Sequence, residues 1–96
     1  MRGVDLAIYA DALAGESASL AARAERAHSR LRQAAIEKRA RSHLSETAIE
    51  RLEARSLLGS VDEAATRAEL RELEASLAAL EELQAWVEAE LATNAA

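Results

Sequence analysis

The chain has 96 residues, no cysteine, no proline and a net charge of −5 at pH 7. This length predicts one domain, and the lack of cysteine excludes disulfides and thiolate metal sites. Half of the residues are hydrophobic, but 25 of these are alanine, so a monomeric core would be thin. Ala, Leu, Glu and Arg dominate and all favour helices, which indicates an all-α protein.

The first predicted helix covers residues 5–42 and has an apolar seam at heptad spacing. The seam consists of Leu6, Leu13, Leu20, Ala27 and Ala34, with Ala10, Ser17, Ala24 and Leu31 between them. Four further alanines are expected to widen this stripe, namely Ala7, Ala14, Ala21 and Ala35. Gly15 lies inside the helix and costs about 1 kcal/mol relative to Ala. It either kinks the helix or is a tolerated surface glycine.

Residues 23–43 hold seven of the twelve basic residues and both histidines. Six arginines form a basic flank beside the seam, and they are Arg23, Arg26, Arg30, Arg32, Arg39 and Arg41. With Glu25 and Glu37 the segment carries +5, whereas residues 59–96 carry −7 from two Arg against nine acidic residues. An antiparallel hairpin would match these charges. Each exposed ion pair is worth only about 0–1 kcal/mol, but the pattern selects an orientation.

The second predicted helix covers residues 46–58, with Ser45 as its N-cap and Leu44 and Ile49 in the positions of a hydrophobic staple. The turn after it is predicted from Gly59, which suits the left-handed conformation that ends a helix. Ser60 and Glu63 have the spacing of a capping box at the start of the third helix.

The third predicted helix covers residues 61–92 and has the clearest 3-4 spacing of apolar residues. Its seam is Leu70, Leu73, Leu77, Leu80, Gln84, Val87 and Leu91. Gln84 either fixes the register of this seam or lies at a solvated end of it. Residues 93–96 are expected to fray. The predicted fold is therefore a long, coiled-coil-like antiparallel hairpin with a short middle helix, three helices in one domain of residues 1–96.

We expect no catalytic, cofactor-binding or metal site. Glu25 and His28 have the Glu-x-x-His spacing of di-iron bundles, but a second copy of the motif is missing. The three glycines are isolated, so no phosphate-binding loop is predicted. Few large apolar residues are present, so no concave pocket is expected. An enzyme is thus not predicted. No apolar run reaches the roughly 20 residues of a membrane span, and a cytoplasmic location is the expectation.

The favoured function is a non-enzymatic module for protein–protein interaction that self-associates through its apolar seam. Five apolar residues fall outside the main stripe, namely Ile8, Tyr9, Ile36, Leu83 and Trp86. The short helix can cover some of them, and an antiparallel homodimer with twofold symmetry would bury the rest. The partner is expected to be a second copy or another helical protein. One alternative is a nucleic-acid-associated accessory protein that uses the basic flank. A helical-bundle metalloenzyme is the least favoured alternative.

Overall fold

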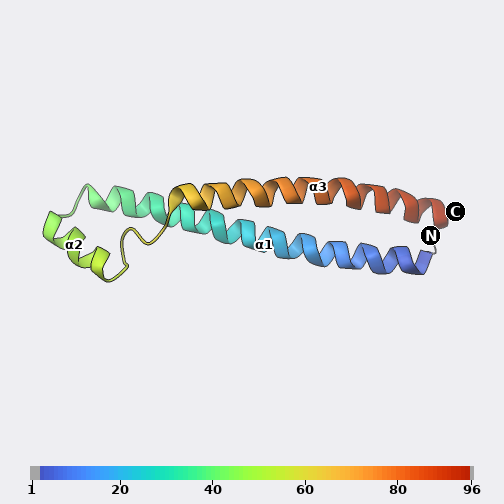
Figure 1. Cartoon of the computed structure of the whole chain (residues 1–96), viewed down its shortest axis with the longest axis horizontal. Helices are drawn as coiled ribbons and strands as arrows, with labels where there is room; N and C mark the ends of the chain where they lie inside the picture. Colours follow the sequence, from blue (N-terminus) through green and yellow to red (C-terminus); the bar gives the residue numbers. More distant parts are fainter. Residues whose placement is uncertain (1–2, 96) are drawn as a thin grey trace. The chain divides into compact units, whose positions relative to one another are not determined.

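The computed structural model describes residues 3–95 and contains three α-helices, α1 (Gly3–Arg41), α2 (Glu46–Ala54) and α3 (Glu63–Ala95) (Figure 1). None of the described residues forms a strand. The prediction of an all-α helical hairpin with a short middle helix is confirmed. α3 continues to Ala95 instead of fraying after residue 92, and the part of that prediction that concerns Ala96 lies outside the described residues. Within residues 3–95, neither long helix has a stretch apolar enough to cross a bilayer.

The chain divides into two compact units. Unit 1 comprises residues 1–24 and 72–96, and unit 2 comprises residues 25–71. Unit 1 thus contains the first part of α1 and most of α3, which run side by side and antiparallel (Figure 1). Unit 2 contains the rest of α1, the whole of α2, the two connections and the start of α3.

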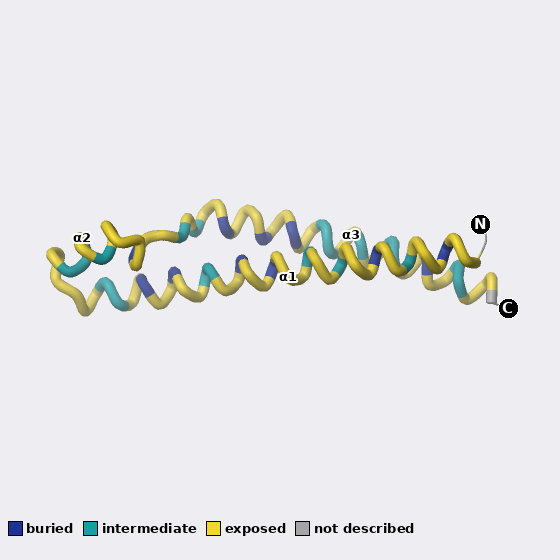
Figure 2. Tube along the Cα trace, turned by 90° about the horizontal axis from the view of Figure 1, so that it is seen from below, coloured by how far each residue is buried: buried dark blue, intermediate teal, exposed yellow. Residues whose placement is uncertain are grey.

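The core of unit 1 is built from large aliphatic side chains. Leu6 and Val87 are each 1% exposed, and they form a cluster with buried Leu13. Four partly buried residues pack against this cluster, and they are Ala10, Leu80, Leu83 and Leu91. The prediction that Leu83 falls outside the main stripe is therefore wrong. Buried positions recur along α1 with exposed residues between them (Figure 2). This pattern is what a helix produces when only one stripe of its surface faces a neighbour.

The core of unit 2 is smaller and more polar. From α1 it contains Ala27, which is completely buried, and Ala34 and Glu37. Leu58, Thr66 and Leu70 contribute from the other elements. Alanine buries little apolar area, so unit 2 gains less from burial per residue than unit 1.

The predicted start of α2 is confirmed. Ser45 has extended backbone angles, with φ −71° and ψ 157°, and its hydroxyl oxygen accepts a hydrogen bond from the Ala48 N–H at 3.2 Å. This bond satisfies one of the N–H groups that the first turn of a helix leaves without a partner.

α2 ends earlier than predicted, at Ala54 instead of residue 58. Ser56 adopts a positive φ of 60°. The Leu57 N–H donates to the Leu52 carbonyl at 2.9 Å, and the Ser56 N–H donates to the Glu53 carbonyl at 3.0 Å. These two bonds form a Schellman motif, which usually places glycine in the left-handed position. A serine there gives no strong signal in the sequence.

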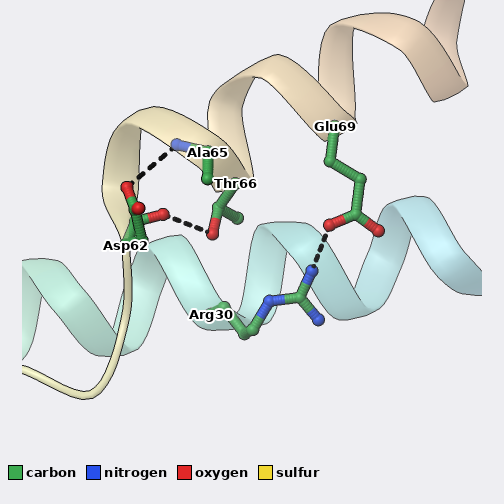
Figure 3. A network of polar contacts seen from close by, with 5 residues as sticks. All are labelled: Arg30, Asp62, Ala65, Thr66 and Glu69. Carbon is green, nitrogen blue, oxygen red and sulfur yellow. Dashed lines mark hydrogen bonds and ion pairs between the residues drawn. The ribbon is translucent and has the colours of Figure 1, made fainter.

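The connection from α2 to α3 confirms one prediction and corrects another. Gly59 has the expected positive φ, at 74°. However, α3 begins at Glu63 rather than residue 61, and Asp62 is its N-cap instead of Ser60. The Asp62 carboxylate accepts from the Ala65 N–H at 3.0 Å, and its carbonyl accepts from the Thr66 hydroxyl at 2.7 Å (Figure 3). The predicted Ser60–Glu63 capping box is wrong because aspartate two residues later caps the same helix.

α1 remains helical through Gly15, which is exposed. A Cβ atom at this position would meet no other atom within 4 Å. Of the two interpretations of Gly15, the structure therefore supports the surface glycine. The four alanines that were expected to widen the seam of α1 are all exposed, so the buried stripe is narrower than the sequence suggested.

Candidate interaction surface

The predicted interaction seam lies inside the hairpin. Every one of its residues is buried or partly buried, and they are Leu6, Leu13, Leu20, Leu31, Leu70, Leu73, Leu77, Leu80, Val87 and Leu91. Gln84, the polar member of the α3 repeat, is also partly buried. These side chains are therefore covered, wholly or in part, within one chain.

Three arginines of the basic flank bond carboxylates, each in a different way. The Arg30 guanidinium donates to Glu69 at 2.9 Å and joins α1 to α3 (Figure 3). The Arg41 guanidinium donates to Glu53 at 2.7 Å and joins α1 to α2. The third, Arg32, bonds Glu25 at 2.9 Å along α1 itself. The Arg30 pair is of the kind that the charge pattern predicts between the helices, whereas the Arg32 pair lies within one helix.

The other three arginines of the basic flank, Arg23, Arg26 and Arg39, are exposed on α1. Arg23 belongs to unit 1, and the other two belong to unit 2. Their guanidinium groups lie on the helix surface, with acidic residues nearby in the sequence at Glu25 and Glu37. The flank is therefore divided between ion pairs and exposed positions.

Glu25 belongs to the Glu-x-x-His motif, and its carboxylate is already engaged. The hydrogen bond and positive charge of Arg32 lower the pKa of Glu25, and the charge of His28 lowers it further. Within residues 3–95, no group of three or more His, Cys, Asp or Glu side chains is arranged to hold a metal ion. The carboxylate of this motif thus serves an ion pair in the structure.

A buried carboxylate in unit 2 was missed by the sequence analysis. The Glu37 side chain is buried, and its two oxygens accept hydrogen bonds from the Gly59 N–H and from the Gln33 amide, both at 3.2 Å. This arrangement ties the connection between α2 and α3 to α1. The sequence signal for this burial was the position of Glu37 three residues after Ala34, on the buried face of the helix. A charged residue in a basic segment is ordinarily expected on the surface.

Unit 2 has a cleft of about 350 Å³, although no concave pocket was predicted from the sequence. Its lining consists of Ala34, Glu37, Lys38, Arg41, Gly59, Val61 and Glu63. The Glu37 carboxylate and the Arg41 guanidinium already have hydrogen-bond partners within the protein. A smaller hollow of about 120 Å³ in unit 1 is lined by Ala10, Leu13, Ala14, Gln84, Val87 and Glu88.

Large apolar side chains remain exposed in both units. Unit 1 exposes Val4, Ile8, Tyr9 and Trp86. Unit 2 exposes Ile36, Leu44 and Leu57. Four of these seven, Val4, Ile8, Ile36 and Leu57, are at least 58% exposed. Exposed apolar groups mark interaction surfaces when they gather on one face. The clearest such pair is on α1 in unit 1, because Val4 and Ile8 lie one turn apart on the same helix face.

Comparison with known proteins found no match: no family model, no curated protein and no solved structure matches the chain.

Proposed function

We propose that this chain is a non-enzymatic helical interaction module that associates with a second copy of itself. The observation that carries this proposal is the set of large apolar side chains exposed on the helices, with Val4 73% and Ile8 64% exposed. Each square ångström of apolar surface removed from water contributes about 25 cal/mol. A second helical surface laid along α1 would bury these groups.

The charges of the two units support an oriented association. From the sequence, unit 1 has two Arg against nine acidic residues and carries −7. Unit 2 has ten Arg or Lys against eight acidic residues and carries +2. Unequal charge along a chain disfavours some alignments of two copies and favours others. The proposal places the module in the cytoplasm, as expected from the sequence.

A nucleic-acid-associated role has weaker support. Phosphate binding needs a continuous surface of uncovered basic side chains. Three of the six arginines of the basic flank bond Glu25, Glu53 and Glu69. A phosphate backbone would have to displace these carboxylates. A metalloenzyme has no supporting feature within residues 3–95.

Sedimentation equilibrium of the full chain at micromolar concentration tests the proposal. A mass of twice 10.3 kDa is the expected result. A monomer mass together with a cooperative thermal transition would overturn self-association. A second series of runs adds a DNA duplex to the protein at increasing salt concentration. It tests the nucleic-acid alternative, because phosphate binding weakens steeply as salt is added.

A further inference from the structure

α1 carries a second seam on its exposed side. Its residues follow the same 3-4 spacing as the buried seam but begin two residues earlier. This outer seam consists of Val4, Ile8, Asp11, Gly15, Ala18 and Ala22, and all six are exposed. Residues at this spacing share one helix face. One helix of unit 1 therefore has two faces suited to helix packing, and α3 covers only one of them.

Gly15 has no function inside the chain that explains its presence. Its backbone has an ordinary helical conformation, and the space beside it is empty out to 4 Å. Glycine in a helix costs about 1 kcal/mol relative to alanine. A glycine in the middle of an apolar face is understandable where another backbone or side chain approaches closely.

The large and small residues of the outer seam fit together when two copies of the seam run antiparallel. If a second α1 is laid antiparallel about residue 13, Val4 lies opposite Ala22 of the second copy and Ile8 lies opposite its Ala18. Asp11 then lies opposite Gly15 of the second copy, where the missing side chain leaves room for water around the carboxylate. Each large residue meets a small one, as close helix packing requires. A parallel alignment would instead place large against large and Asp11 against Asp11.

The charges beside the outer seam also fit the antiparallel alignment. Asp5 follows Val4 in the sequence, and Arg23 follows Ala22, so both lie on the same side of the seam. Both side chains are exposed. In the antiparallel alignment Asp5 comes beside Arg23 of the second copy, and twofold symmetry gives this pair twice. Glu16 follows Gly15 and lies on this side of the seam as well, whereas six of the nine acidic residues of unit 1 lie on α3.

We infer that a second copy of the chain docks along the outer seam of α1, antiparallel, with the twofold axis crossing the seam at the level of residue 13. This inference rests on the proposed self-association and specifies its surface. The stretch from Val4 to Ala22 is about 27 Å long. A single polar residue, Asp11, lies within the seam, and such residues are used to fix the register of helix pairs.

Cysteine cross-linking tests the alignment, because the chain has no cysteine of its own. One full-length variant carries Ile8→Cys and another carries Ala18→Cys, and the two are mixed with glutathione disulfide as oxidant. The antiparallel alignment brings these two positions within the Cα separation of roughly 7 Å that a disulfide permits. Each variant alone should remain uncross-linked, since identical positions lie ten residues apart along the axis, about 15 Å. The control mixture replaces Ala18→Cys with Ala21→Cys, which is exposed but outside the seam.

A mixed disulfide between residues 8 and 18, absent from both single variants and from the control mixture, supports the inference. Cross-linking of Ala18→Cys with itself would indicate a parallel pair and overturn the inference.

The second measurement compares Ala18→Glu with Ala21→Glu by sedimentation equilibrium. A carboxylate buried in the seam should weaken the dimer at least about 10-fold, whereas the same change at Ala21 should leave the dimer unchanged. A wild-type dimer that Ala18→Glu does not weaken would overturn the outer seam and leave the proposed function standing. A wild-type monomer would overturn both.

Discussion

In unit 1, α1 and α3 are held together by leucine and valine side chains, whereas the core of unit 2 combines alanines and two leucines with polar bonds. Leu6, Leu13 and Val87 form the cluster of unit 1. In unit 2 the Arg30–Glu69 and Arg41–Glu53 pairs and the buried Glu37 join the elements. The chain therefore uses burial where it has large apolar side chains and specific polar contacts where it has small ones.

A chain rich in alanine can fix the position of its helices by such polar contacts. Apolar contacts are not directional, so a leucine cluster tolerates small shifts of one helix along another. A hydrogen bond to a backbone N–H requires a defined geometry. The bond from the Gly59 N–H to Glu37 holds the connection between α2 and α3 in a defined position against α1, shortly before α3 begins.

The largest effect is expected from Leu6→Ala. Leu6 is 1% exposed, and removing a buried leucine side chain leaves a cavity that costs about 2–5 kcal/mol. Urea unfolding followed by the fluorescence of Trp86, which lies in the same unit, measures this loss.

The matched control is Leu57→Ala in unit 2, where the side chain is 60% exposed. This change should alter the free energy of unfolding by no more than about 0.5 kcal/mol. Equal losses for the two variants would contradict the assignment of Leu6 to the core.

The next effect concerns the polar bonds of unit 2. Glu37→Ala removes the acceptor for the Gly59 N–H and for the Gln33 amide, and each such hydrogen bond contributes about 0.5–1.5 kcal/mol. Glu37→Gln keeps an acceptor oxygen of similar size and should lose less. Thermal unfolding by circular dichroism compares the two variants. If Glu37→Gln is as damaging as Glu37→Ala, the charge rather than the hydrogen bonds stabilises this site.

A smaller effect is expected at the start of α3. Asp62→Ala removes the acceptor for the Ala65 N–H and should cost about 0.5–2 kcal/mol. Ser60→Ala should change stability by less than about 0.5 kcal/mol, because Asp62 is the cap. Chemical denaturation of both variants decides between the two caps, and the reverse order of losses would restore the Ser60 capping box.

The smallest effect concerns the Glu25–Arg32 pair on the surface of α1. Arg32 lowers the pKa of Glu25, so the pair stabilises the folded state above the ordinary pKa of glutamate. This contribution disappears as the pH falls through the lowered value. In Arg32→Gln the pKa of Glu25 should move up toward its ordinary value. A titration of the Glu25 carboxyl signal by NMR measures the change, and an unmoved pKa would show that another group lowers it.

The helices and their buried faces were predictable because periodic spacing is a local property of the sequence. The 3-4 repeat of α3 runs from Leu70 to Leu91, and the packing of these residues follows from it. The start of α2 was predictable for the same reason, since Ser45 has a cap residue's chemistry at the right position.

The connection between α2 and α3 was only partly predictable because several residues compete for the same roles. Ser60 and Asp62 are both good N-caps, and two residues, Ser56 and Gly59, adopt a positive φ. Residue type and spacing alone therefore did not decide which of these residues ends or starts a helix. The burial of Glu37 was hidden for a similar reason, since its hydrogen-bond donor lies 22 residues away.

The contacts of unit 2 also have a consequence for the order of folding. The bonds Arg41–Glu53, Glu37–Gly59 and Arg30–Glu69 join residues 12, 22 and 39 positions apart. The cluster of unit 1 joins Leu6 to Val87, which closes a loop of 81 residues by the difference of their numbers. Closing that loop first would cost about 2 kcal/mol more entropy than closing the shortest one. The folding nucleus should therefore form around α2, and contacts between the two long helices should then form progressively toward the ends of the chain.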